Sequence, residues 1–578
     1  MFPVTAILYL CLLSMTMATP PLPRLAISLR PIFTSTNISN SPPEITALNV
    51  TITLSGIPYL NPMLSHIINN GATKTIQHPD LPAYDETGPF LFTTYIDTNS
   101  SNAIRFWSAV RKPIGDVTVG PLIITPPVGL GIGNGPRVDL RRDPGGGLVG
   151  LGEGFIPRPA VDEEWDVTVR WEFNEYELPQ GFRAVSSLGE GKEARIIGRP
   201  GRVVDKTYFA VGRVGRWPPW DQDLVQADEG GKGNGEFAMY WMGDPPPWDM
   251  DALGKRVRNL TAAVRGFFGE PQDSFRMFWR RAARGYGGAG GFRSFMLEYA
   301  EFSEEELTGE ALENLIAHES IHGYALMNPV RQEDVWYREG IAVYYAVVAP
   351  FLAGSVDKSY LLRWMNNNEQ AYYTGGTTNL TWKYVLDHYW TSTALARTSY
   401  YRGFIYLAYC EGLINKATNG TKSLDDVVIA LYRRYKAEYP TQTEHFLAVL
   451  GEYVGMEVAE TSFKLFTDGD LIVPAADSLV RFGMRMKRTS CEKLELGFSE
   501  GSLGTGIITD LVPGSRAEEA GLREGDKVVR SGGFSTTGDS LNNTLKVVVK
   551  RDGGEAAIVF RPRSRETVDC YQWVVDGQ

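Results

Sequence analysis

The chain of 578 residues has few of the residues that form disulfides and structural metal sites, with only 4 cysteines and 6 histidines. Cys11 lies in the first apolar segment and leaves with it, so three cysteines remain, which excludes a four-cysteine structural zinc site. Cys491 and Cys570 flank the last part of the chain and could join its ends by one disulfide. Cys410 lies in an apolar helical run, which predicts a buried thiol.

Strong net charge and long apolar runs are also missing. The formal net charge of -11 is spread along the chain, which gives no reason to expect nucleic acid as a partner. Beyond the amino terminus no stretch offers about eighteen uninterrupted apolar residues, so no transmembrane anchor is expected. Residues 1–18, MFPVTAILYLCLLSMTMA, have an apolar core and end in small residues, with a plausible cleavage site after Ala18. This pattern predicts a signal peptide and a secreted or lumenal protein.

Sequons for N-glycosylation agree with a secretory route. In each of them an asparagine precedes x-Ser/Thr without an intervening proline: Asn37, Asn49, Asn99, Asn259, Asn379, Asn419 and Asn542. Such triplets also arise by chance, so they support secretion without establishing it.

The length predicts about three or four domains, and a hydrophobic content of 43% is ample for their cores. Residues 19–205 have the pattern of a β domain, with alternating runs such as Ile45–Ile57 between glycine and proline clusters. The glycine-rich run Gly129–Phe155 lacks the ending of a phosphate loop and is interpreted as an irregular connection. Residues 206–482 combine strands with amphipathic helices, which predicts an α+β domain with a helical lobe.

The most specific chemical signal is His318-Glu319-x-x-His322. On a helix, two histidines four positions apart lie on one face and can share one metal ion. Glu319 is then placed to take a proton from a water that the metal makes acidic. This HExxH pattern is typical of zinc hydrolases.

A catalytic zinc usually has three protein ligands and one open position. The third ligand is most simply Glu339, with sixteen residues between it and His322. A glycine, an asparagine and a proline in that gap supply a break, and the apolar spacing after Glu339 suits a buried helix. An acid at the head of such a helix is costly to bury unless it meets a cation. We therefore predict one Zn²⁺ per chain, held by His318, His322 and Glu339.

These residues carry a family resemblance. HExxH followed by WYREG around Glu339 is similar to the gluzincin peptidases, which read HExxH and then W-x-x-E-G. The segment TSYYRGFIYLAY (Thr398–Tyr409) resembles the Y-x-K/R-G segment of the same group, whose tyrosine donates a hydrogen bond to the developing oxyanion. The resemblance implies that Glu319 is the general base, that Tyr400 stabilises the oxyanion, and that the α+β domain is thermolysin-like.

Residues 488–578 contain a second recognisable unit, because LELGFSEGSLGTGIITDLVPGSRAEEAGLREGDKVVRSGG (Leu494–Gly533) is similar to a PDZ domain. Leu496, Gly497 and Phe498 match the loop whose backbone N–H groups receive a peptide carboxylate. The residues after it match the helix, turn and strand that follow. Such a domain binds the carboxy terminus of an extended peptide along an open strand edge. Alternatively it only packs against the catalytic lobe, and the sequence leaves both open.

A gluzincin lobe followed by a PDZ-like domain is the arrangement of the glycyl aminopeptidase family, rather than of the large membrane-associated aminopeptidases. The resemblance implies a β-sandwich-like fold for residues 19–205. Related aminopeptidases hold the free amino group of the substrate with a glutamate in a glycine-rich motif, but Gly285–Phe295 contains no acid. Exopeptidase and endopeptidase action therefore both stay open. Met296–Glu298 is the candidate edge strand for substrate.

The sequence as a whole predicts a secreted zinc metallopeptidase that hydrolyses peptide or protein substrates with a metal-activated water. The alternative is a non-catalytic protein that keeps the metal for its shape and binds peptides through its PDZ-like domain.

Overall fold

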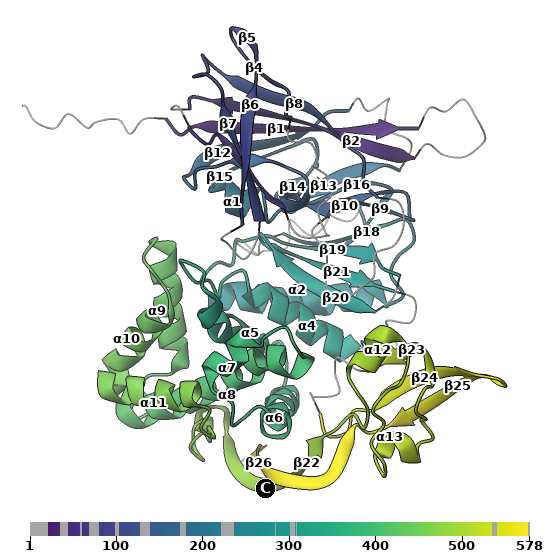
Figure 1. Ribbon diagram of the computed structural model, residues 1–578. Coiled ribbons are helices and arrows are strands. Elements are labelled where there is room, and N and C mark those ends of the chain that lie inside the picture. Colours follow the sequence, from purple (N-terminus) through teal and green to yellow (C-terminus); the bar gives the residue numbers. More distant parts are fainter. Residues whose placement is uncertain are drawn as a thin grey trace, which may run out of the picture. The chain divides into compact units, whose positions relative to one another are not determined.

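The computed structural model describes residues 21–34, 44–57, 60–68, 80–98, 103–127, 139–173, 181–220, 236–283, 285–300, 307, 309–533 and 540–575. It divides into two compact units, one made of residues up to Val214 and the other mainly of residues from Gly215 on (Figure 1). The predicted signal segment, residues 1–18, lies outside the described residues. A search of the described helices finds none long and apolar enough to cross a membrane.

The first unit consists of β-sheets, as the alternating sequence pattern predicts. Among its described residues the strand orders are β15-β12-β1-β2-β8-β4-β5, β14-β13-β16-β10-β9 and β11-β3-β7-β6. The strands are β1 (Arg24–Phe33), β2 (Ile45–Ser55), β3 (Leu64–Ile68), β4 (Ala83–Asp85), β5 (Gly88–Phe90), β6 (Phe92–Asp97), β7 (Ala103–Ala109), β8 (Val117–Ile124), β9 (Arg141–Asp143), β10 (Gly147–Leu151), β11 (Arg158–Pro159), β12 (Trp165–Trp171), β13 (Arg183–Ser186), β14 (Gly189–Glu190), β15 (Glu193–Gly198) and β16 (Tyr208–Gly212), with a short helix α1 (Pro200–Val203).

Two predictions from the sequence differ from the structure of this unit. The run Gly129–Phe155 is not an irregular connection throughout, because it contains β9 and β10. Glycine is needed there for close approach, since a Cβ on Gly150 would lie 2.6 Å from the Cα atom of Leu140. The domain boundary predicted after residue 205 falls before β16, a strand that pairs with β10 and β13 and so belongs to the first unit.

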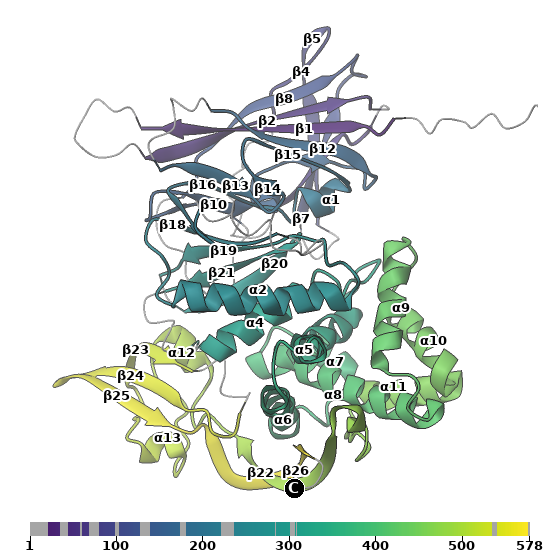
Figure 2. The same cartoon turned by 180° about the vertical axis from the view of Figure 1, so that it is seen from behind.

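A mixed sheet with the order β17-β18-β19-β21-β20 is the platform of the second unit. Strands β18, β19 and β21 are parallel, and β20 is an antiparallel strand at the edge. Helix α2 lies along this sheet with α4 beside it (Figure 2), and side chains of both helices pack into one apolar cluster with the strands. The bounds are β17 (Val214–Trp217), β18 (Phe237–Met242), α2 (Met250–Phe267), β19 (Phe275–Arg281), β20 (Tyr286–Gly291), β21 (Ser294–Tyr299) and α4 (Gly309–Ile321).

The expectation that Met296–Glu298 forms the sheet edge is wrong. These residues lie in β21, which is paired with β19 on one side and with β20 on the other. The glycine-rich strand β20 lies at the edge instead. A two-residue turn joins it to β21, and the two strands pair antiparallel.

The helical lobe is built around α5 (Val335–Leu352), as the buried apolar run after Glu339 predicts. Its aromatic and aliphatic side chains form the centre of a large core to which the surrounding helices contribute. These helices are α6 (Lys358–Thr374), α7 (Trp382–Asp387), α8 (Thr393–Thr418), α9 (Leu424–Lys436), α10 (Thr443–Val454) and α11 (Met456–Asp468). Cys410 of α8 is buried as predicted, and burial raises the pKa of its thiol to about 12.

The last part of the chain begins and ends in one antiparallel ribbon. Strands β22 (Met484–Leu494) and β26 (Arg563–Val575) pair along most of their length, and the predicted disulfide between Cys491 and Cys570 joins them. The ribbon packs on α6, where the indole nitrogen of Trp573 donates a 2.8 Å hydrogen bond to buried Glu369. The elements in between are α12 (Gly501–Thr505), α13 (Arg516–Glu519), β23 (Lys527–Gly532), β24 (Leu545–Arg551) and β25 (Gly554–Phe560).

Helices α5 and α8 cross at a pair of glycines. A Cβ on Gly403 would lie 2.4 Å from the carbonyl oxygen of Trp336, and one on Gly340 would lie 2.7 Å from the Cα atom of Gly403. Both distances are shorter than any real contact, so only glycine permits this approach. Because Tyr400 precedes Gly403 by about one helical turn, the crossing also fixes where Tyr400 lies.

Replacing Gly403 with alanine should therefore lower the free energy of unfolding by about 1–3 kcal/mol, the usual cost of overpacking. Gly266, in α2, is a matched control because nothing lies within 4 Å of a Cβ placed there. Gly266→Ala should leave the stability unchanged or raise it by about 0.5–1 kcal/mol. Chemical unfolding of the two variants checks this, and a Gly403→Ala midpoint equal to that of the wild type would refute the close crossing.

Candidate metal centre

Three side chains from α4, its carboxy-terminal turn and α5 converge on one point. The Nε2 atoms of His318 and His322 lie 3.5 and 3.4 Å from Oε2 of Glu339. The ligand atoms of this group all lie within 4.8 Å of one another, and within the described ranges no other group of histidines, cysteines and acids meets in this way. The structure thus brings together the three residues that the sequence singled out.

The donor set fits a divalent cation. Glu339 is only 8% exposed, and its Oε2 atom accepts no hydrogen bond from any described residue. Burial would raise the pKa of Glu339, but the neighbouring imidazoles of His322 and His318 lower it well below its ordinary value. A carboxylate that stays charged while buried needs a cation beside it. Two imidazoles and one carboxylate are a common ligand set of catalytic zinc.

Glu319 lies beside this group, on the same helix and half-buried. Burial raises the pKa of its carboxyl group to about 7, with His318 opposing and Glu339 reinforcing the rise. The backbone N–H of Gly290 in β20 donates a hydrogen bond to it, and a Cβ on Gly290 would lie 3.7 Å from Oε2 of Glu319. The edge strand β20 therefore runs directly past Glu319, which the sequence alone did not reveal.

Tyr400 of α8 lies next to the first histidine. Its ring is nearly parallel to that of His318, with the ring centroids 5.7 Å apart and an interplanar angle of 10°. Burial, followed by the charges of Glu339 and Glu319, raises the pKa of the phenol well above its ordinary value. The phenol therefore stays protonated at neutral pH. It can donate a hydrogen bond toward His318, His322 and Glu339, which together are called the metal group below.

Two further charged residues, Glu298 and Arg338, belong to elements that carry the site. Glu298, the acid closest in sequence to the glycine-rich strand, is fully buried and forms a 2.5 Å ion pair with Arg280. The carboxylate of Glu298 is therefore paired with Arg280 inside the sheet. Arg338, which sequence reasoning missed, precedes Glu339 on α5 and acts electrostatically on Glu319. A charged residue in the otherwise apolar run of α5 is the signal that could have identified it.

The predicted peptide-binding loop lies in the terminal domain. Phe498 is buried in the small core there, and Leu496 packs against the same core. The helix and strand expected after the loop are present as α13 and β23. After Ser499 and Glu500, however, the chain enters α12 rather than a strand, so these described residues offer no strand edge for a peptide. Carboxylate binding by Leu496, Gly497 and Phe498 stays a prediction.

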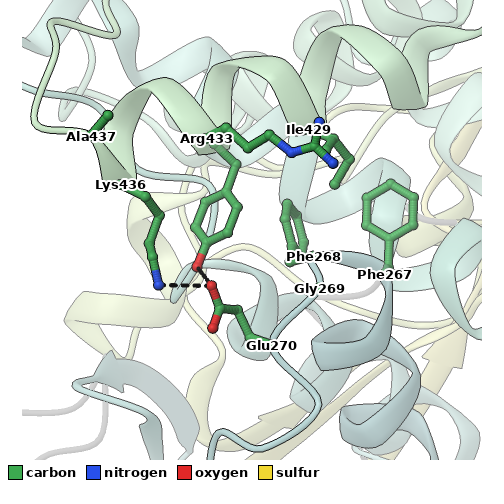
Figure 3. Close-up of a pocket in the computed structure, with 9 residues that line it drawn as sticks. Phe267, Phe268, Gly269, Glu270, Ile429, Arg433, Lys436 and Ala437 are labelled. Atoms are coloured by element: carbon green, nitrogen blue, oxygen red, sulfur yellow. Dashed lines mark hydrogen bonds and ion pairs between the residues drawn. The ribbon is translucent and has the colours of Figure 1, made fainter.

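A cavity of about 490 Å³ lies apart from the metal group, between the end of α2 and α9 (Figure 3). At one side Glu270 accepts hydrogen bonds from the hydroxyl of Tyr432 at 3.1 Å and from Nζ of Lys436 at 2.8 Å. The aromatic rings of Phe267 and Phe268 line the other side (Figure 3). None of the residues that line this cavity belongs to the metal group.

The sequons differ in accessibility. Those in the described part of the chain with exposed asparagines are Asn259, Asn379, Asn419 and Asn542. Asn49 lies in the middle of β2, where the oxygen of its side chain is buried. Asn37 and Asn99 lie outside the described residues. Glycosylation stays a prediction at all of these positions.

No protein-family model and no curated protein matches this sequence. Solved structures do. An aminopeptidase N family protein from Idiomarina loihiensis has a TM-score of 0.60 at 14% identity, over 96% of this chain and 98% of that chain. An M1 zinc metallopeptidase from Deinococcus radiodurans (TM-score 0.44, 14% identity, 78% of this chain and 94% of that one) and yeast LTA4 hydrolase (TM-score 0.44, 13%, 78% and 68%) overlap less well. The first match shows that the chain shares its multidomain fold with an aminopeptidase N family protein.

Metal binding can be tested without any substrate. Adding Zn²⁺ to metal-free protein should raise its thermal midpoint, because a ligand at a hundred times its Kd stabilises the folded state by about 2.7 kcal/mol. His322→Ala should abolish this stabilisation and the stoichiometric zinc content, whereas His388→Ala, which lies outside the group, should keep both. Elemental analysis and thermal unfolding measure the outcome, and zinc retained at one ion per chain in His322→Ala would rule out this ligand set.

Proposed function

We propose that this chain is a zinc-dependent metallopeptidase that hydrolyses peptide bonds with a metal-activated water. The convergence of His318, His322 and Glu339 beside the acid–base group Glu319 is the observation that carries the proposal. The shared fold with an aminopeptidase N family protein supports the same reaction class. A zinc ion bound by these three residues would lower the pKa of a water and polarise a substrate carbonyl.

The residues of the chain supply the other parts of the reaction. Glu319, which lies beside the three ligands, takes the proton of the attacking water and passes it to the leaving amine. Tyr400 keeps its proton and donates a hydrogen bond to the carbonyl oxygen as that oxygen gains charge. Because β20 passes beside Glu319 at the sheet edge, an extended substrate can pair with its main chain.

We extend the proposal to the cell compartment and to the terminal domain. Secretion is supported by the apolar residues 1–18, and glycosylation by the exposed sequons. A PDZ-like identity of residues 488–578 is supported by the order of α13 and β23 after the Leu496-Gly497-Phe498 loop. Packing against the helical lobe has the stronger support of the two roles considered for this domain, because the ribbon of β22 and β26 rests on α6 and α12 occupies the place of a strand edge.

Glu319→Gln tests the acid–base role. The amide keeps the size and position of the side chain but cannot accept the proton of the water, so hydrolysis should fall to background while zinc stays bound at one ion per chain. Mass spectrometry of a digested peptide library, together with elemental analysis, measures both quantities. Turnover at the wild-type rate would remove Glu319 from the reaction.

Tyr400→Phe tests the hydrogen bond to the developing oxyanion. Removal of one such donor typically lowers kcat by about 10²–10³-fold, and we expect this loss with little change in KM or zinc content. Tyr409→Phe is the matched control, because Tyr409 lies on the same helix and is half-buried outside the metal group. If the two variants show the same kcat, Tyr400 plays no part in transition-state stabilisation.

A further inference from the structure

The cavity between the end of α2 and α9 is lined by residues that the proposed reaction does not use (Figure 3). Its volume of about 490 Å³ lies within the range of small-ligand sites, which is roughly 300–1,000 Å³. Gly269, Arg433 and Lys436 line the cavity and are exposed, so it opens to solvent. A small solute can therefore enter it.

One wall of the cavity is aromatic and is held in place by the core of the helical lobe. The ring of Phe268 is nearly parallel to that of Tyr324, with the centroids 4.8 Å apart, and meets the ring of Tyr432 edge-on at 5.3 Å. The ring of Phe267 lies 4.6 Å from that of Tyr345 on α5. These contacts fix the rings within the protein itself, so ligand binding would cost little reordering of the wall.

Apolar surface stays accessible at this wall. Phe267 and Ile429 both line the cavity and are only half-buried. An apolar group of a ligand placed against them would remove this surface from water, which favours binding. Because aromatic rings pack well against one another, the wall favours a phenyl ring or a branched group of similar size.

The other side of the cavity carries an ion pair. Glu270 accepts hydrogen bonds from Tyr432 and Lys436, both at the same carboxylate oxygen. Burial would raise the pKa of Glu270, but these two hydrogen bonds lower it below its ordinary value, so the carboxylate is charged at neutral pH. The positive charge of Lys436 is therefore compensated by Glu270.

Arg433 adds a second positive charge to the cavity. Figure 3 shows its side chain reaching from α9 toward Ile429 and away from Glu270. It forms no hydrogen bond or ion pair with any residue that the structure describes, whereas the adjacent Arg434 donates a 2.7 Å hydrogen bond to the carbonyl oxygen of Pro440. The lining thus holds two cations and one acid, a balance that favours a ligand with a negative group.

We propose that this cavity binds a small ligand in which an aromatic or branched apolar group is joined to one carboxylate. The apolar group lies against Phe267, Phe268 and Ile429, and the carboxylate pairs with the guanidinium of Arg433. A guanidinium can hold a carboxylate through two parallel hydrogen bonds, which gives orientation as well as affinity. A free N-acylated amino acid and the carboxy-terminal residue of a peptide both present this chemistry. The proposal is independent of the peptidase function, because no lining residue belongs to the metal group.

Three probes separate the two parts of the ligand. N-acetylphenylalanine carries the ring and the carboxylate, its amide carries only the ring, and N-acetylglycine carries only the carboxylate. In calorimetry with the zinc-loaded protein, N-acetylphenylalanine should bind about tenfold or more tightly than either of the others, as expected for one charged hydrogen bond and one buried ring. Equal affinities of the three probes, or no binding of N-acetylphenylalanine at millimolar concentration, would overturn the proposal.

Two substitutions in the cavity should act on different parts of the probe. Arg433→Gln should weaken N-acetylphenylalanine about tenfold and leave its amide unchanged, so that the ratio of the two affinities falls close to one. Ile429→Ser should weaken both alike and keep the ratio. Arg434→Gln is the matched control, because it removes the same charge from the same helix outside the cavity lining.

Each ratio is measured within one variant, so partial unfolding does not alter it. An undiminished ratio in Arg433→Gln, or an equal fall of the ratio in Arg434→Gln, would refute the role of Arg433.

A carboxylate can also bind a zinc ion, so the calorimetry is repeated after removal of zinc with a chelator. The affinity for N-acetylphenylalanine should stay the same, because the cavity residues do not hold the metal. Loss of binding on removal of zinc would place the probe at the metal group and overturn the proposal.

An acetylated peptide that ends in Gly-Gly-Phe with a free carboxylate distinguishes the two sources of the ligand. The Glu319→Gln protein is used, so that the peptide stays intact. Binding as tight as that of N-acetylphenylalanine would support peptide ends as ligands, and binding at least tenfold weaker would support free acids. An affinity for both ligands that Arg433→Gln leaves unchanged would contradict the proposal.

Discussion

The carboxylate of Glu339 is buried at the head of α5, and this charge constrains much of the surrounding structure. The two neighbouring imidazoles keep it ionised there, in place of the water it has lost, and a cation bound between them would do so further. The histidines come from α4, so α4 must pack closely on α5. On the other side α8 approaches α5 at Gly340 and Gly403, which brings Tyr400 to the same point. The geometry of the site thus follows from three helices that have little freedom to move apart.

Much of this site could be predicted because its signals are local. The spacing of His318 and His322 fixes their common helix face, and the apolar run after Glu339 identifies a buried helix that can hold an acid only beside a cation. The pairing of Cys491 with Cys570 was also accessible, because few cysteines leave few choices. For both the metal ligands and the disulfide, the chemistry of the residue types limited the possible partners before the fold was known.

The glycine-rich strands could not be predicted, because glycine has no side-chain pattern from which to infer a strand. Glycine is required within β20 at Gly288, because a Cβ there would lie 2.2 Å from the ring of Phe295 on β21. The choice of β20 rather than β21 as the edge likewise depends on which strands pair. Arg338 was missed for a related reason, since a charge in a sequence does not say whether a distant residue neutralises it.

The terminal domain contacts the helix that carries Tyr400. Glu500, next to α12, accepts a 3.1 Å hydrogen bond from the backbone N–H of Thr393, the first residue of α8. A carboxylate at that end satisfies an otherwise unpaired N–H group and interacts favourably with the helix dipole. Tyr400 lies two turns further along α8. A domain held to the lobe by the β22–β26 ribbon on α6 therefore also contacts the helix that places the proposed oxyanion donor, so its packing role is linked to the site even without a bound peptide.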